Sequence, residues 1–431
     1  MAEEKFDAIV IGAGLAGCAA AYKLAKAGLE VVVIERGQSA GSKNLSGGAF
    51  YTRILHELIP NFWEEAPVER YIIRNIVTFM TEEASFSIDF RTQDFAKPPY
   101  NAFSVLRANF DQWLAGKAEE AGAMMVNGIR VDQLLKENGR VVGVVAGEET
   151  MRADVVIAAD GANSFMAQQA GLRGPIPPEH MAVGVKELIG IPRTTLEDRF
   201  SLKEDEGVAY AIDGHATRGV AGGGFMYTNK ESISIGIVMR LNDLLKAKLK
   251  PSDVMEDFLA QPMIAPLVKD GKLLEYGAHL VVEGGLQMMP KLYSDGILVT
   301  GDAAGFGVNS GLVVRGMDLA VGSGMAAADT IIEAKKAGDF SSQTLSSYAQ
   351  KLEKTFVLKD MRTYAKAPSF MENKRLYTTY PELANSLMEN IFTIDGTPKD
   401  HLMSVVRKAL GESGVSLFTL ANDGWKGVRA L

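Results

Sequence analysis

Residues 6–35 decide the fold, and they read FDAIVIGAGLAGCAAAYKLAKAGLEVVVIE. The β-branched run at 6–11 is typical of a buried parallel strand, and the run at 31–34 predicts a second one. Between them, a glycine-rich turn leads into a helical pattern that extends to Ala27, with Gly28 as its cap. This order of elements within about 30 residues indicates a dinucleotide-binding βαβ unit: a strand, the GxGxxG turn, a helix, a second strand and an acidic residue.

The glycines of this turn have distinct expected roles. Gly12 allows a tight turn out of the strand, Gly14 lets a pyrophosphate approach the backbone, and Gly17 lets helix and strand pack closely. The pyrophosphate is expected at the helix N-terminus, where the helix dipole favours anions. Glu35 has the spacing of the acid that binds ribose hydroxyls, and its charge disfavours a 2′-phosphate. The expected contacts of this unit are Gly12, Ala13, Gly14, Ala16, Gly17, Glu35 and Arg36.

Two later segments indicate which dinucleotide is bound. An apolar run at 152–160 ends in Asp160-Gly161, and a short strand pattern at 297–300 ends in Gly301-Asp302. Together with the first motif, and in this order, they resemble FAD enzymes with a glutathione-reductase-type Rossmann fold. The resemblance implies that Asp160-Gly161 closes over the pyrophosphate and that Asp302 binds the ribityl chain, so the expected cofactor is FAD. An N-cap role for Asp302 is compatible with this.

The segment between these motifs fits the same resemblance. A helix is expected within 104–122, with Asn109 as its cap and Gly122 after its end. Arg107, just before it, matches an arginine that contacts FAD in that family; a surface arginine is the alternative. A strand is expected at 128–135, and its Val131 matches the position that packs near the adenine.

A second glycine cluster, GSKNLSGG at 41–48, follows the second strand. Its small residues suit a loop pressed against an isoalloxazine ring, with Lys43 near the anionic edge of the ring. An ordinary flexible loop is the alternative. The expected FAD contacts here are Lys43, Ser46, Gly47 and Gly48.

Composition excludes several classes of protein. The 431-residue chain is 47% hydrophobic and 23% charged, with a net charge of −8, which suits a globular protein and disfavours nucleic-acid binding. Cys18, the single cysteine, cannot hold an iron–sulfur cluster, and the histidines show no metal-ligand spacing, so no metal site is expected. No apolar run could span a membrane and the N-terminus lacks a secretory signal, so a cytoplasmic protein with at most a peripheral membrane contact is expected.

The predicted fold class is α/β: a glutathione-reductase-type FAD-binding Rossmann fold with an inserted α+β substrate domain and a helical C-terminal region. The FAD-binding domain is expected from 1–75, 105–175 and 285–345, and the substrate domain from 76–104 and 176–284, where strand patterns dominate. Residues 345–431 are expected to be mainly helical, with breaks at Pro368, Pro381 and Pro398, and to bind a partner.

Segments along the whole chain resemble one family with this fold. Residues 311–320 read GLVVRGMDLA and residues 390–396 read NIFTIDG, and both closely resemble FixC (EtfC), the flavoprotein subunit of electron-bifurcating FixABCX/EtfABCX complexes. Residues 222–227 and 276–287 also resemble a wider relative, the electron transfer flavoprotein:quinone oxidoreductase. That relative holds a [4Fe–4S] cluster on C-terminal cysteines, which this sequence lacks. The matching FAD contacts in the first segment are Gly311, Leu312 and Val313.

The resemblance implies an electron-transfer role. A FixA/FixB-type (EtfA/EtfB) electron transfer flavoprotein would oxidise NADH and split its two electrons. One would go to ferredoxin or flavodoxin, and the other would reach the FAD of this chain. FixC proteins pair with a ferredoxin-like [4Fe–4S] subunit, FixX (EtfX). The FAD would then reduce a quinone, menaquinone or ubiquinone, at the inner face of the cytoplasmic membrane.

In the quinone oxidoreductase, two glycine pairs line the quinone head group, and their motifs fall here on Gly222, Gly223, Gly284 and Gly285. Glycine exposes backbone N–H and C=O groups to a flat ligand, so no acid or base side chain is required there. Strand-end turns are the alternative. The quinone tail needs an exposed apolar entrance, with ordinary core positions as the alternative. The candidates for this entrance are Phe225, Met226, Met288 and Met289.

Three rival functions stay open on the sequence alone. A FAD-dependent geranylgeranyl-type prenyl reductase shares the FAD motifs but gives no reason for the segments at 311–320 and 390–396. An aromatic hydroxylase needs NAD(P)H; no second nucleotide fingerprint is present, although such enzymes often bind NADPH without one. The third alternative is a non-enzymatic FAD-bearing assembly subunit, which only redox assays would exclude.

Overall fold

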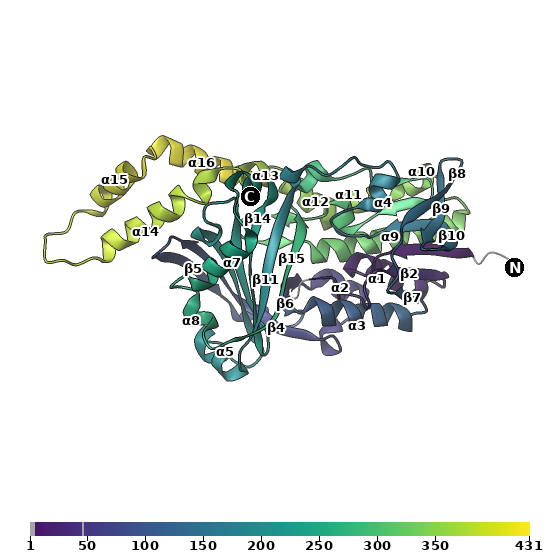
Figure 1. Ribbon diagram of the computed structural model, residues 1–431, viewed down its shortest axis with the longest axis horizontal. Helices are drawn as coiled ribbons and strands as arrows, with labels where there is room; N and C mark the ends of the chain where they lie inside the picture. Colours follow the sequence, from purple (N-terminus) through teal and green to yellow (C-terminus); the bar gives the residue numbers. More distant parts are fainter. Residues whose placement is uncertain (1–4, 45–46) are drawn as a thin grey trace.

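Two β-sheets and a helical C-terminal region make up the protein (Figure 1). The computed structural model describes residues 5–44 and 47–431, so Ser46, an expected FAD contact, lies outside the described residues. The arrangement confirms the predicted fold class, an α/β Rossmann fold with an inserted α+β domain and a helical C-terminal region.

The first sheet has eight strands, and its central part is parallel in the order β17-β10-β1-β2-β7. Strands β2 and β17 are buried apolar runs, as is typical of a parallel sheet covered by helices, and residues 8–10 of β1 are fully buried. Helix α1 packs against both α3 and α9. The strands are β1 (Lys5–Ile11), β2 (Val31–Glu35), β7 (Met124–Asn127), β8 (Gln133–Glu137), β9 (Arg140–Ala146), β10 (Glu149–Ala158), β16 (Tyr293–Ser294) and β17 (Ile297–Val299).

The second sheet has nine strands in the order β15-β11-β14-β13-β12-β4-β6-β3, with β5 paired to β4. It is antiparallel except where β4 pairs with β12. Its strands are β3 (Gly48–Tyr51), β4 (Val68–Met80), β5 (Ser85–Arg91), β6 (Ala102–Val105), β11 (Met181–Gly190), β12 (Glu206–Gly214), β13 (Gly222–Thr228), β14 (Ser232–Arg240) and β15 (Lys272–Val282). A small separate sheet pairs β18 (Val308–Asn309) with β19 (Val314–Arg315).

The helices fall into three groups by their place along the chain. Those before residue 193 are α1 (Leu15–Lys26), α2 (Arg53–Leu58), α3 (Arg107–Glu120) and α4 (Phe165–Gln169). Those of the inserted part are α5 (Arg193–Phe200), α6 (Leu241–Ala247), α7 (Pro251–Ala260) and α8 (Ala265–Val268). The rest are α9 (Met317–Ala337), α10 (Ser342–Leu345), α11 (Ser347–Lys354), α12 (Phe356–Thr363), α13 (Ala367–Phe370), α14 (Thr379–Phe392), α15 (Leu402–Ser413) and α16 (Leu417–Ala430). Short 3-10 turns are η1 (Phe62–Glu64), η2 (Gln93–Ala96), η3 (Pro178–His180), η4 (His215–Thr217), η5 (Gly285–Met288), η6 (Gly301–Ala304) and η7 (Lys374–Leu376).

Helices α14 and α15 form an arm that projects from the body of the protein (Figure 1). Helix α14 packs along α15 and against β4 and β5, and Asn385 Nδ2 donates a hydrogen bond to the carbonyl of Phe79 at 2.9 Å. The arm is therefore tied to the second sheet at its base. Further out, Phe392 and Ile394 are 77% and 78% exposed. Within the described part of the chain, no helix is long and apolar enough to cross a membrane.

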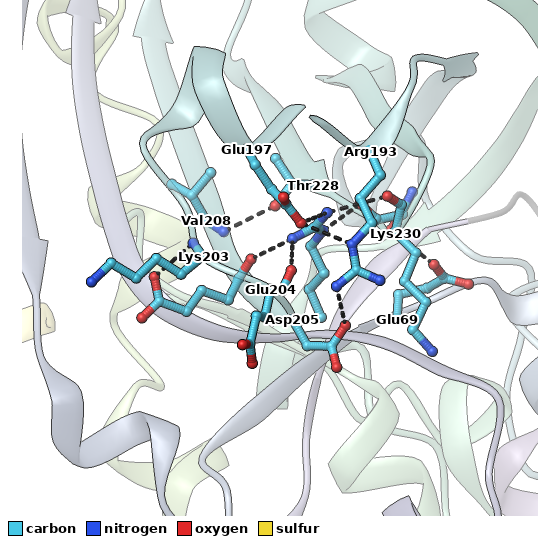
Figure 2. A network of polar contacts seen from close by, with 12 residues as sticks. Glu69, Arg193, Glu197, Lys203, Glu204, Asp205, Val208, Thr228 and Lys230 are labelled. Carbon is cyan, nitrogen blue, oxygen red and sulfur yellow. Dashed lines mark hydrogen bonds and ion pairs between the residues drawn. The ribbon is translucent and has the colours of Figure 1, made fainter. Parts of the chain in front are cut away.

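A network of polar contacts, which includes Glu197 and Lys230, joins several elements around the second sheet (Figure 2). Arg70 of β4 is fully buried, and its guanidinium donates to four backbone carbonyls, of which one is that of Glu204. The other three belong to Asn229 at 2.7 Å, Glu206 at 3.1 Å and Lys230 at 3.2 Å. The guanidinium also donates to Glu197 Oε1 at 3.3 Å. Arg70 thus connects β4 with β12, with the turn between β13 and β14, and with α5.

Two local predictions around 105–135 are wrong. Helix α3 already begins at Arg107, so Asn109 lies inside its first turn and does not cap it. Of the expected strand at 128–135, only residues 133–135 lie in a strand, β8, because β7 ends at Asn127 and the chain turns at Gly128, which has φ of 78°. Val131 consequently lies in the connection before β8 and not in a strand.

The expected boundary at 75/76 falls inside a single strand. Strand β4 runs for 13 residues across it, and β3, within the range expected for the FAD-binding domain, pairs with β6 of the second sheet. Strand β4 is continuous across the boundary because its residues 74–80 pair with β5 and its residues 71–80 pair with β12. The domain ranges as a whole stay a prediction.

Candidate functional site

A cavity of about 640 Å³ is lined by residues of both sheets. It opens at the carboxyl ends of β1, β2 and β17, which is where open α/β sheets commonly bind ligands. Three predicted site residues of the described chain, Ala13, Gly17 and Gly284, do not line it. The predicted residues that do are Gly12, Gly14, Ala16, Glu35, Arg36, Lys43, Gly47, Gly48, Arg107, Val131, Asp160, Gly161, Gly222, Gly223, Gly285, Gly301, Asp302, Gly311, Leu312 and Val313.

The turn after β1 leaves room for a ligand at the start of α1. Gly12 has φ of 100°, a conformation that favours glycine, and a Cβ there would collide with the carbonyl of Ala159. A Cβ on Gly17 would collide with the carbonyl of Gly12, so this glycine serves helix–strand packing. By contrast, a Cβ on Gly14 would meet no atom within 4 Å. Gly14 therefore faces open space at a helix N-terminus, which suits an anionic group.

The carboxylate of Glu35 holds the backbone at this turn. Its Oε2 accepts a hydrogen bond from the amide of Ala13 at 2.9 Å, and its Oε1 accepts one from the amide of Gly37 at 2.6 Å. A carboxylate has about four acceptor positions, so two stay available. Since Glu35 also lines the cavity, these positions suit the hydroxyls of a ribose.

Arg107 is fixed by a carboxylate one helical turn away. Its Nε and Nη2 donate to the two oxygens of Asp111 at 2.6 and 2.7 Å. Asp111 also accepts from Asn44 Nδ2 at 2.8 Å, which attaches the loop at 41–44 to α3. Burial raises the pKa of Asp302 across the cavity, and the charge of Arg107 opposes this rise. The side chains of Arg107 and Asp302 thus present a donor and an acceptor to the same cavity.

Asp160 carries a polar atom without a partner. Its Oδ2 accepts from the amide of Met166 at 3.0 Å, whereas its buried Oδ1 has no hydrogen bond within residues 5–44 and 47–431. Burial raises the pKa of this carboxyl. An orphaned acceptor beside Gly161 fits a ligand that brings a hydroxyl or another donor to this point, as a dinucleotide does.

Sequence reasoning missed Lys186, which β11 directs into the cavity. Its Nζ donates to the carbonyl of Gly47 at 2.6 Å and lies 5.3 Å from the ring centre of Phe225. Burial, with the charge of Arg107, lowers the pKa of Lys186 to about 8. The available signal was a lone lysine in the strand sequence MAVGVKELIG. Lys186 links β11 to the glycine-rich loop expected beside the flavin.

Of the glycine pairs expected at a quinone, Gly222, Gly223 and Gly285 line the cavity. Gly284 is instead packed against His180 and Met288, where a Cβ would come within 2.7 Å of both side chains. Two candidates for an exposed tail entrance, Met226 and Met288, are 0% and 3% exposed, so that prediction is wrong for them. Met226 is buried because alternate residues of β13 face the second core. Phe225 and Met289 are half-buried.

Family models cover nearly the whole chain. A model described as an FAD binding domain matches residues 5–355, and one described as the ETF-QO/FixC family C-terminal domain matches residues 367–431. With the Rossmann sheet, the open position at Gly14 and the orphaned acceptor on Asp160, this defines the protein as an FAD-dependent oxidoreductase. Within that class, the chain belongs to the ETF-QO/FixC family and acts in electron transfer.

Similar proteins support this assignment over the full length. The chain is 46% identical to the probable electron transfer flavoprotein-quinone oxidoreductase YdiS of Escherichia coli K12 over 431 residues, with 100% of each chain covered. It is 46% identical to protein FixC of the same organism, again covering 100% of both. It is 41% identical to protein FixC of Azotobacter vinelandii, covering 99% of each.

Solved structures show the same fold. A geranylgeranyl bacteriochlorophyll reductase-like protein from Thermoplasma acidophilum superposes with a TM-score of 0.72 at 22% identity, covering 95% of this chain and 97% of that one. The halogenase PltM in complex with phloroglucinol and FAD gives a TM-score of 0.63 at 16% identity, covering 97% and 86%. At these identities the likeness concerns the fold alone.

Proposed function

We propose that this protein is the quinone-reducing FAD subunit of an electron-bifurcating electron transfer flavoprotein complex. The proposal rests on one observation: the same cavity is lined by Gly14, at the dinucleotide turn, and by Gly223, on the second sheet. A cofactor bound to the first sheet and a flat substrate on the second would therefore share one space, as electron transfer between them requires.

The residues of the first sheet would bind FAD, which supplies the electron chemistry when bound. The N-terminus of α1, with Gly14 and Ala16, would receive the pyrophosphate, and Glu35 would receive the adenosine ribose. Asp302 would accept from the ribityl chain, and Arg107 would donate to the cofactor. Other proposed contacts are Gly12, Arg36, Lys43, Gly47, Gly48, Val131, Asp160, Gly161, Gly301, Gly311, Leu312 and Val313, all of which line the cavity.

The second sheet would receive the quinone head group beside Gly222 and Gly223, which begin β13. Phe225 lines the same wall and adds an aromatic surface. Ala211 of β12 pairs with Phe225, and Asp213, two residues further along β12, lines the cavity. Because alternate residues of a strand share a face, a larger side chain at Ala211 would fill this part of the cavity.

The proposed partners are a FixA/FixB-type electron transfer flavoprotein and a FixX-type [4Fe–4S] subunit. The single cysteine supports the second partner: Cys18 is buried, and its Sγ donates to the carbonyl of Ala13 at 3.3 Å. Burial also raises the pKa of this thiol, which disfavours the thiolate that a metal needs. Electrons from NADH would thus reach this chain through other subunits.

A peripheral contact with the inner face of the cytoplasmic membrane is the proposed location. Its support is the helical arm and α16, which expose an unusual number of large apolar side chains. Replacing Phe392 and Phe418 by serine should reduce flotation of the FAD-loaded protein with anionic lipid vesicles. Replacing Phe90 of β5, which is 53% exposed but lies outside the arm and α16, should not. The most exposed of these apolar residues are Phe392, Ile394, Leu402, Met403, Leu417, Phe418, Trp425 and Val428.

The direct test follows the visible absorbance of the oxidised flavin under anaerobic conditions. The FAD-loaded chain is mixed with NADH, then with NADPH, and finally with the FixA/FixB-type and FixX-type partners. We expect bleaching by NADH only with the partners present, and recovery on adding a short-chain quinone. Ala211→Trp should keep FAD and its reduction by partners but lose the recovery. Rapid bleaching by NADPH alone would replace the proposal with a prenyl reductase or hydroxylase.

A further inference from the structure

The wall of the cavity around Gly223 contains a carboxyl group that no neighbour occupies. Asp213 lies near the end of β12 and lines the cavity. Within residues 5–44 and 47–431, its side chain takes part in no hydrogen bond and no ion pair. A carboxyl inside a protein is ordinarily paired, so an unpartnered one that faces a cavity suits contact with a ligand.

The carboxyl of Asp213 lies next to the glycines at the start of β13. A Cβ built on Gly223 would lie 3.3 Å from Asp213 Oδ1, and Ile212 pairs directly with Gly224. The absence of a side chain at Gly223 therefore leaves the acid open to the cavity. A flat ligand on the backbone of Gly222 and Gly223 would have the carboxyl of Asp213 at its edge.

Three other ionisable groups that line the cavity have partners of their own. Arg240 of β14 and Glu283 after β15 face each other at 3.7 Å. The hydroxyl of Tyr377, after η7, donates to the carbonyl of Met371 at 2.8 Å. His215 of η4, which follows β12, does not line the cavity. Arg240, Glu283 and Tyr377 thus share the cavity wall with Asp213, yet none of the three is paired with it.

Burial also shifts the titration of Asp213 into the neutral range. It raises the pKa of this carboxyl from 3.8 to about 7. A proton donor works best when its pKa lies near the working pH. The carboxyl of Asp213 is thus open to the cavity, and its pKa lets it hold and release a proton in the physiological pH range.

We propose that Asp213 is a catalytic residue that donates a proton to a quinone oxygen as the quinone is reduced. This inference rests on the proposed quinone reduction. A quinone becomes a quinol by gaining two electrons and two protons. Bound FAD, in its reduced and singly protonated form, would supply both electrons and one proton. The second proton leaves Asp213: its O–H bond breaks as the quinol O–H bond forms, and water then reprotonates the carboxylate.

The experiment separates proton transfer from electron transfer. FAD in the purified chain is photoreduced anaerobically and mixed with ubiquinone-1, and the return of the flavin absorbance is timed. In parallel, ferricenium replaces the quinone, because this acceptor takes single electrons and no proton. Asp213→Asn should slow reoxidation by the quinone about 100-fold, the lower end of general-acid effects, and leave reoxidation by ferricenium unchanged.

Two further variants complete the comparison. Asp213→Glu keeps an acid and should restore part of the quinone rate, and Asp198→Asn, at an exposed position of α5, should behave as the wild type. The wild-type quinone rate should fall above about pH 7, while the rate of Asp213→Asn stays flat. Equal quinone rates in Asp213→Asn and the wild type would overturn the role of Asp213. No reoxidation of the wild type by quinone, with ferricenium active, would instead overturn the proposed function.

Discussion

The amide of Ala13 donates a hydrogen bond to the carboxylate of Glu35 at 2.9 Å, across 22 residues of sequence. This bond ties the turn after β1 to the end of β2, and a second bond from the amide of Gly37 at 2.6 Å fixes the other carboxylate oxygen. Glu35 is therefore already held in place on the protein side. An acid held in this way can meet a ribose without first losing rotamer freedom, which lowers the entropic cost of binding.

Gly14→Val should abolish FAD retention while leaving the chain folded. A Cβ at Gly14 meets no protein atom within 4 Å and its φ is −77°, so the fold can accept a side chain that then occupies the pyrophosphate position. The measurement is the flavin absorbance per mole of purified protein, with circular dichroism as the check on folding. Gly116→Val, which also meets no atom within 4 Å but lies away from the cavity, is the control. A yellow, FAD-loaded Gly14→Val protein would contradict the assignment of this position.

Gly17→Val should fail differently from Gly14→Val. A Cβ at Gly17 would collide with the carbonyl of Gly12, so the clash is within the protein. We expect loss of soluble, folded protein rather than a folded protein without FAD. The yield of soluble chain and its circular dichroism distinguish the two results, and a well-folded Gly17→Val protein would show that α1 can move away from β1.

The dinucleotide half of the site was predictable from sequence because its signals are local. The turn at 12–17 and the acid at Glu35 belong to one βαβ unit, so their spacing in sequence determines their spacing in space. Lys186 and Asp213 were not predictable in this way. Each reaches the cavity only because β11 and β12 take particular places in a sheet whose neighbours are far apart in sequence. The same long-range pairing buries Met226, which the local apolar pattern could not reveal.

Lys186→Met should lower the reduction potential of the bound FAD. Lys186 donates to Gly47 in the loop proposed to lie against the flavin, and a cation there stabilises the negative charge that reduction adds. We expect a fall of roughly 30 mV or more, which corresponds to about 1.4 kcal/mol for two electrons. A dye-coupled anaerobic titration measures this potential. Lys269→Met, at an exposed position, is the charge-matched control, and an unchanged potential in Lys186→Met would place the flavin away from this lysine.

Arg70→Ala should destabilise the second sheet without affecting FAD content. Arg70 is fully buried and does not line the cavity, and its removal takes a donor away from the backbone carbonyls of Asn229, Glu206 and Lys230. Each buried carbonyl left without a donor costs about 1–3 kcal/mol. Urea unfolding measures the change. Arg193→Ala removes the exposed partner of Glu197 and should cost less than about 1 kcal/mol, so similar losses for both variants would contradict the buried role.

Asp213→Asn should stabilise the protein at neutral pH but not in acid. Burial raises the pKa of Asp213 from 3.8 to about 7, so the folded state favours the protonated carboxyl. Below about pH 4 the carboxyl is protonated in both states; as the pH rises to 7 the unfolded state loses its proton first, and wild-type stability falls by up to a few kcal/mol. Asparagine does not titrate, so the variant avoids this loss. Urea unfolding of both proteins should show a difference near zero at about pH 4 and largest at about pH 8. Exposed Asp198→Asn supplies the flat reference, and an Asp213→Asn difference that is equally flat would mean that folding does not change the pKa of this carboxyl.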